Sequence, residues 1–113
     1  MRIDFDTEHL SGRPREIADA IVEFLKTENA DSEWALSDGG CQAFWFPEEW
    51  KARGERYGTE SLLVLVHDGG DLNACVNYDC GSYGRIARFD AMLKTMGVYV
   101  EACTGWYSAI YEM

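Results

Sequence analysis

The sequence lacks several features that would assign a function directly. Nowhere do eighteen apolar residues follow one another, so a membrane-spanning helix is not expected. The first twenty residues carry Asp4, Asp6 and Arg13 and no long apolar run, which leads us to expect no export signal and a cytoplasmic location. The G-x-G-x-x-G and P-loop glycine patterns are also absent, which leaves nucleotide binding without support.

Basic residues are scarce. Ten lysines and arginines stand against twenty aspartates and glutamates, for a net charge of −10 at pH 7. The whole excess lies in two segments without a cation: six acidic residues between Lys26 and Lys51, and four between Arg56 and Arg85. Such a field repels nucleic acids and anionic membranes, so we predict no direct binding to either and a basic protein partner. Acidity also serves solubility, so an accessory protein whose acidity serves solubility alone stays an alternative.

Pairs of closely spaced metal ligands are missing. The chain has four cysteines and two histidines, and of the cysteines only Cys75 and Cys80 come near each other, with four residues between them. Structural zinc sites need ligand pairs two to four residues apart together with a second pair. We therefore expect no metal site and no cofactor, and we expect the cysteines to be reduced in the cytoplasm.

The apolar residues that are present predict one compact domain over residues 1–113. A chain of 113 residues that is 47% hydrophobic can bury one core. Residues 11–30 predict a helix with Ile17, Ile21 and Leu25 on one face, and residues 83–96 predict a second helix that ends at Gly97. Residues 47–53 begin with proline and two glutamates, which favours a short third helix.

The remaining patterns predict strands. Residues 61–67 form a nearly continuous apolar run, typical of a central strand, and glycine turns separate two predicted hairpins. We therefore predict an α+β fold: a mostly antiparallel sheet of about five to seven strands, with two main helices packed on one face. The segments predicted as strands are 2–5, 33–37, 41–46, 61–67, 72–78, 98–103 and 106–112.

Cys41 raises the possibility of a thiol enzyme. A thiol needs a neighbouring imidazole to ionise near neutral pH, and His67, oriented by Asp68 or Asp71, could supply it. Thiol enzymes usually place the cysteine at the start of a long helix, whereas Pro47 interrupts the segment here. The glycines before Cys41 already have a role in a hairpin turn. A Cys41/His67 enzyme therefore remains the alternative hypothesis, and we predict that the protein is not an enzyme.

Aromatic residues are more numerous than one small core needs, and many stand beside carboxylates. Aromatic rings provide contact area and carboxylates pair with lysine and arginine, so together they suit a basic partner. Large sheets also bury tyrosine and tryptophan with their polar tips in water, which accounts for part of this set. The residues predicted to contact a partner are Glu48, Glu49, Asp68, Asp71, Asp79, Trp45 and Trp50.

In its size, acidity and predicted fold the chain resembles the small acidic inhibitors of phages and mobile elements, especially anti-CRISPR and antirestriction DNA mimics. It is also similar to immunity proteins that block nuclease toxins. The resemblance covers the composition of the whole chain and rests on no motif. It implies a non-enzymatic inhibitor that binds the basic, nucleic-acid-binding surface of a CRISPR effector or nuclease, as a monomer or a homodimer and without a cofactor.

Overall fold

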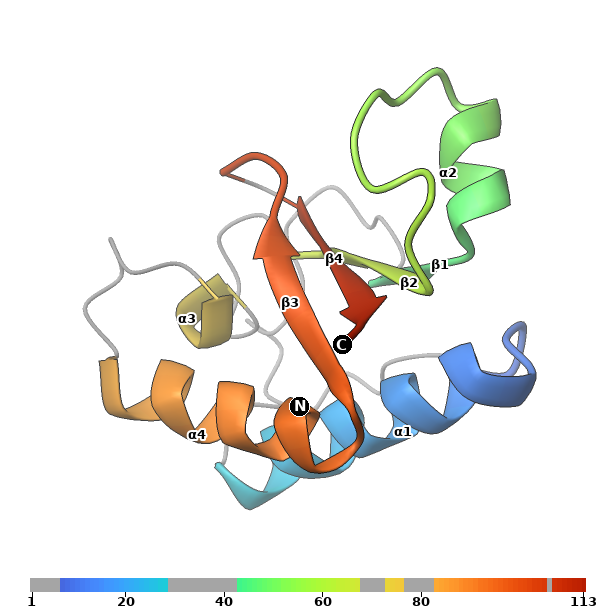
Figure 1. Cartoon of the computed structure of the whole chain (residues 1–113). Helices are drawn as coiled ribbons and strands as arrows, with labels where there is room; N and C mark the ends of the chain where they lie inside the picture. Colours follow the sequence, from blue (N-terminus) through green and yellow to red (C-terminus); the bar gives the residue numbers. More distant parts are fainter. Residues whose placement is uncertain (1–6, 29–42, 68–72, 77–82, 106) are drawn as a thin grey trace, which may run out of the picture.

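The computed structural model describes residues 7–28, 43–67, 73–76, 83–105 and 107–113, and these form an α+β arrangement (Figure 1). None of the helices in this part of the chain is long and apolar enough to span a membrane. Along the chain the elements are α1 (Gly12–Thr27), β1 (Phe44–Trp45), α2 (Pro47–Ala52), β2 (Leu63–Val66), α3 (Asn73–Val76), α4 (Tyr83–Thr95), β3 (Val98–Ala102) and β4 (Tyr107–Glu112).

The described strands form one antiparallel sheet in the order β1-β2-β4-β3. The prediction of five to seven strands is therefore wrong, because the sheet described has four. One cause lies in the segment predicted as a strand over 72–78, where Asn73–Val76 form the helix α3. A short alternation of polar and apolar residues also fits one helical turn, and here it buries Cys75 completely. The predicted strands 2–5 and 33–37 lie outside the described residues.

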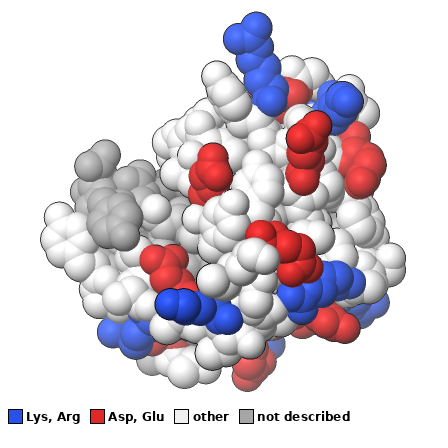
Figure 2. Space-filling view, viewed as in Figure 1, with Lys and Arg blue, Asp and Glu red and all other residues white. Residues whose placement is uncertain are grey.

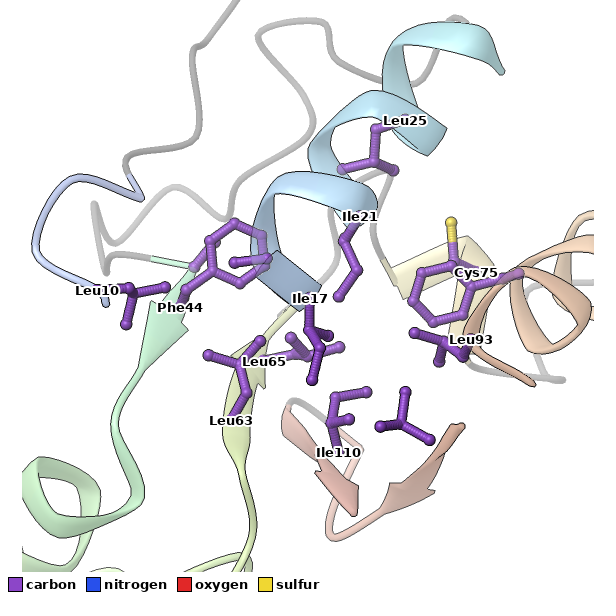
Figure 3. Close-up of a cluster of buried hydrophobic side chains, with 14 residues drawn as sticks. Leu10, Ile17, Ile21, Leu25, Phe44, Leu63, Leu65, Cys75, Leu93 and Ile110 are labelled. Carbon is purple, nitrogen blue, oxygen red and sulfur yellow. The ribbon is translucent and has the colours of Figure 1, made fainter. Parts of the chain in front are cut away.

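One face of the sheet is covered by the two long helices, as the sequence predicts. Ile17 and Ile21 of α1 are fully buried, and Leu93 of α4 is fully buried beside them. These side chains meet Leu63 and Ile110 from the two central strands (Figure 3). The helical spacing of apolar residues therefore gives both helices their position on this face.

The opposite face is covered by α2, the short helix predicted over 47–53, although the predicted architecture placed no helix on this face. Trp50 of α2 packs against Val64, Val66 and Tyr107, and all four side chains are buried. Pro47 starts this helix, and Glu48 and Glu49 follow in its first turn, where the helix dipole favours carboxylates. The central strands are therefore buried on both faces, which explains the unbroken apolar run of β2.

An ion pair joins the end of α1 to α4. Arg88 donates two hydrogen bonds to Glu28, with nitrogen to oxygen distances of 2.6 and 3.0 Å, and Arg85 lies 3.5 Å from the same carboxylate. The hydrogen bonds from Arg88 hold the pKa of Glu28 below its usual value. Two segments that are distant in sequence are thereby held together by charge as well as by apolar packing.

Candidate partner-binding surface

The described part of the molecule is close to charge balance. It contains twelve of the twenty acidic residues and nine of the ten basic residues, for a net charge of −3. The rest of the excess belongs to residues outside this part, among them Asp68, Asp71 and Asp79. Figure 2 shows acidic and basic side chains interspersed over the viewed face. A binding surface in the described part must therefore come from particular carboxylates and not from a uniform negative field.

Glu48 and Glu49 are exposed at the start of α2, as a partner-contacting role requires. Neither forms an ion pair with another described residue. Lys51 follows them in the last turn of the same short helix, and Arg53 ends it. The surface of α2 therefore carries both signs of charge.

The two tryptophans predicted as anchors lie in a packed aromatic layer. Trp50 is 0% exposed, and its ring centroid is 5.4 Å from that of Trp45 and 5.0 Å from that of Tyr107. The guanidinium of Arg53 lies over both indoles, 5.1 Å from the Trp45 ring and 4.7 Å from the Trp50 ring. Trp50 is thus a core residue that offers no surface to a partner, and Trp45 is half-buried beneath an arginine of its own chain.

His67, the imidazole of the alternative enzyme hypothesis, lies in the interior. It is 2% exposed, and its Nε2 is 2.8 Å from the hydroxyl of Ser108, which is itself 0% exposed. Because Ser108 belongs to β4, this hydrogen bond ties the end of β2 to the neighbouring strand. Cys41 lies outside the described residues. His67 is thus a buried residue with a structural contact within the sheet.

The described thiols lack the environment of a nucleophile. Cys75 is buried in the main core. Burial, together with the charge of Glu101, raises the pKa of Cys103. An activated thiol needs the opposite shift, because only the thiolate attacks. Among the described residues, no group of three or more histidine, cysteine, aspartate or glutamate side chains is arranged to hold a metal ion.

A combination of rings and carboxylates does occur on β3 and β4. Tyr99 and Tyr111 face each other across the two strands, with ring centroids 5.7 Å apart and planes at 25°, and Tyr99 is 44% exposed. Burial raises the pKa of Tyr111, and the nearby Cys103, Glu101, Tyr99 and Glu60 add to the shift. Glu101 lies two residues from Tyr99 on the same face of β3, and the charge of Glu60 also acts on Tyr111.

We call Tyr99, Tyr111, Glu60 and Glu101 the tyrosine–carboxylate patch. Neither glutamate has an ion pair with another described residue, and both are exposed. The strand alternation in the sequence already places Tyr99 and Glu101 on one face. Only the register of the hairpin, which sets Tyr111 opposite Tyr99, completes the patch, and for this reason it is missing from the predicted contact residues.

The chain was compared with known protein families, with curated proteins and with solved structures, and none matches. Its function must therefore be inferred from its own residues.

Proposed function

We propose that the protein is a non-enzymatic acidic inhibitor that binds a basic, nucleic-acid-binding surface of a protein partner, in the manner of an anti-CRISPR DNA mimic or an immunity protein. The observation that carries the proposal is the tyrosine–carboxylate patch. Stacked, partly exposed rings give an arginine or lysine stem a flat surface, and two glutamates without an ion pair in the described part can receive its charge.

The proposed mechanism is occupation of the site that nucleic acid would use. A partner that binds phosphates carries clustered arginines and lysines, and carboxylates on a small rigid domain can take the place of those phosphates. Glu48 and Glu49 extend the surface, because α2 lies on the same face of the sheet as Tyr99 and Tyr111. Asp68, Asp71 and Asp79 remain predicted contributors. A cytoplasmic location, also a prediction, fits such a target.

The charge of the whole chain gives the proposal a kinetic signature. A net charge of −10 steers a basic partner toward the molecule, so association should slow as salt is added. Contacts made by the tyrosine rings are little affected by salt and should set the lifetime of the complex. Tyr99→Ala is therefore expected to speed dissociation, whereas removal of glutamate charges is expected to slow association.

The test compares two double variants that change the net charge equally. Glu60→Gln with Glu101→Gln removes the charges of the patch, and Glu16→Gln with Glu23→Gln removes two exposed charges from α1, on the opposite side of the sheet. Immobilised wild-type protein and both variants are used to capture partners from a bacterial lysate at low and high salt. Each captured protein is then purified and titrated with the wild-type protein in a nucleic-acid binding assay.

The wild-type protein and the α1 variant should capture the same basic protein, and the patch variant should bind it about tenfold more weakly, which corresponds to about 1.4 kcal/mol. Stoichiometric addition of the wild-type protein should release nucleic acid from that partner. Equal capture by all three proteins, or a partner that keeps its nucleic acid, would refute the proposal.

A further inference from the structure

The edge of the sheet beside the patch has a defined hydrogen-bonding pattern. At one end of the β3–β4 ladder the N–H of Met113 donates to the carbonyl of Gly97 at 3.0 Å, and at the other the N–H of Cys103 donates to the carbonyl of Tyr107 at 3.2 Å. In an antiparallel pair, hydrogen-bonded residues alternate with residues whose backbone groups point the other way. In the residues of β3 that alternate with Gly97 and Cys103, the backbone N–H and carbonyl groups therefore point away from β4.

These residues are Val98, Val100 and Ala102. Because β3 is the last of the described strands in the order β1-β2-β4-β3, their N–H and carbonyl groups face the outer edge of the described sheet. Val98 is buried, but Val100 is half-buried and Ala102 is exposed. None of the three has a hydrogen bond on this side with a described residue. The exposed part of the edge can therefore accept another strand.

Two adjoining hollows lie along this edge between β3 and the helices. Residues of α4 line both of them, and Val76 of α3 also lines the second. Their volumes are about 220 and about 160 Å³, and both are lined by Val100 and Asp90. Tyr99 of the patch lines the first hollow together with Lys94, and Ala102 lines the second. The two hollows form a groove next to backbone groups that make no hydrogen bond with a described residue.

The charges around the groove favour a basic occupant. Asp90 lies at the centre of the groove and makes no ion pair with a described residue. Glu101 is exposed on the other face of the same strand. Lys94 is the one described cation that lines either hollow. A second copy of this chain would bring another charge of −10 to the edge, which disfavours edge-to-edge pairing between copies.

We infer that the outer edge of β3 binds an extended, lysine- or arginine-rich segment of the partner by β-strand addition. This inference rests on the proposed function and specifies how its partner is bound. The residue of the segment opposite Val100 lies on the Asp90 side, and the residues before and after it lie on the side of Tyr99 and Glu101. Neighbouring basic residues in the segment can thus reach carboxylates on both faces of the strand.

Amide hydrogen exchange measured by NMR tests the inference directly. The probe is a synthetic peptide of about twelve residues in which pairs of neighbouring lysines alternate with pairs of threonines, so that its lysines point to both faces of the strand. Threonine is chosen because it favours strands, and the control peptide has glutamate in place of each lysine. In the free protein the amides of Tyr99 and Glu101 should exchange slowly, because they bond to β4. The basic peptide should slow exchange of the Val100 and Ala102 amides by about tenfold or more, and the acidic peptide should leave them unchanged.

Two variants at one position provide a second measurement. Val100→Pro removes the outward N–H without removing a hydrogen bond to β4, as proline at a sheet edge can, and Val100→Ala removes side-chain volume but keeps the N–H. Val100→Pro should weaken peptide binding by about tenfold, and Val100→Ala by less than about threefold. Circular dichroism checks whether each variant is folded. The exchange measurement is made on the wild-type protein, so it tests the inference even if a variant fails to fold.

The inference is overturned if the basic peptide does not bind, or if it binds without protecting the Val100 and Ala102 amides. The capture experiment distinguishes failure of this inference from failure of the proposed function. If the Glu60→Gln with Glu101→Gln variant loses its captured partner while Val100→Pro keeps it, the patch binds the partner and the strand edge does not. If both variants keep the partner, both proposals fail.

Discussion

Replacement of Trp50 by alanine separates a core role from a role in binding. The indole is 0% exposed and packs against Trp45 and Tyr107, with ring centroids 5.4 and 5.0 Å away. Loss of a buried tryptophan costs about 3–5 kcal/mol, and each aromatic pair contributes about 0.5–1.5 kcal/mol of it. Arg53 also loses the ring that it covers at 4.7 Å. We therefore expect the Trp50→Ala variant to lose about 4 kcal/mol of its free energy of unfolding.

Urea unfolding followed by circular dichroism measures this loss. Since domains of this kind have unfolding free energies of about 5–15 kcal/mol, the variant should keep a reduced but measurable transition or lose it altogether. The melting temperature should fall by about 15 °C or more. Trp45→Ala is the matched control, because Trp45 is half-buried in the same layer, and its loss should be about 1–2 kcal/mol. A loss below about 1 kcal/mol for Trp50→Ala would refute the core assignment and return this tryptophan to the candidate partner contacts.

The remaining predictions concern a turn, an ion pair and a thiol. Gly58 has φ +75°, and a Cβ added there would lie 3.1 Å from a neighbouring side chain, so Gly58→Ala should lower the free energy of unfolding in urea by about 2 kcal/mol. Gly105→Ala is the control, because a Cβ there meets no atom within 4 Å, and it should lower that free energy by less than about 0.5 kcal/mol. Equal losses would contradict the turn geometry. Arg88 lowers the pKa of Glu28 in the folded state, so the stability it contributes is present above the usual value of 4.5 and is lost as pH falls toward the folded pKa. The urea midpoints of wild type and Glu28→Gln should therefore differ at pH 7 and converge below about pH 4.5, and a constant difference down to pH 3 would exclude this coupling. Because its pKa is raised by burial, Cys103 should react with iodoacetamide more slowly in the folded than in the urea-unfolded protein, as resolved by peptide mass spectrometry; equal rates would contradict its burial.

The sequence predicts the helices well because apolar residues spaced three and four apart fit a helix and do not fit a strand. Ile17, Ile21 and Leu25 repeat every four residues, and all three are fully buried in α1. Residues 83–96 predict α4 for the same reason, and Gly97 follows it with φ +76°. The apolar run at 61–67 likewise predicts β2. Each of these patterns is local, so it predicts its element without information on which segments pack against it.

Strand number and partner choice are less predictable because they depend on tertiary contacts. The segment 72–78 alternates as a strand would, yet α3 forms there and buries Cys75. Nothing in the local pattern of β2 indicates that its neighbours are β1 and β4, because residues distant in sequence supply both. A count of strand-like segments therefore overestimates the size of the sheet.

The sequence predicts the residue types of the candidate site, and the fold decides where their side chains lie. Rings beside carboxylates were expected, but Trp50 faces the sheet, as its position three residues after Pro47 in a short helix allows. Pro47 and Trp50 are both buried, and their spacing of three residues places them on one face of the helix, which was a signal that Trp50 belongs to the core. Tyr99 and Glu101 could be placed together from strand alternation, whereas the stacking of Tyr111 on Tyr99 required the hairpin register.

The order of the strands has a consequence for synthesis of the chain. β4 lies between β2 and β3 in the sheet, yet it is the last of the described strands along the sequence. At about 5–20 residues per second, the ribosome needs about 2–8 s to add the roughly forty residues between the end of β2 and the start of β4. Throughout that interval the four apolar residues of β2 have no strand on the side that β4 will occupy. A chain that ends before β4 would therefore present an unpaired edge of β2, which a strand of another chain can join.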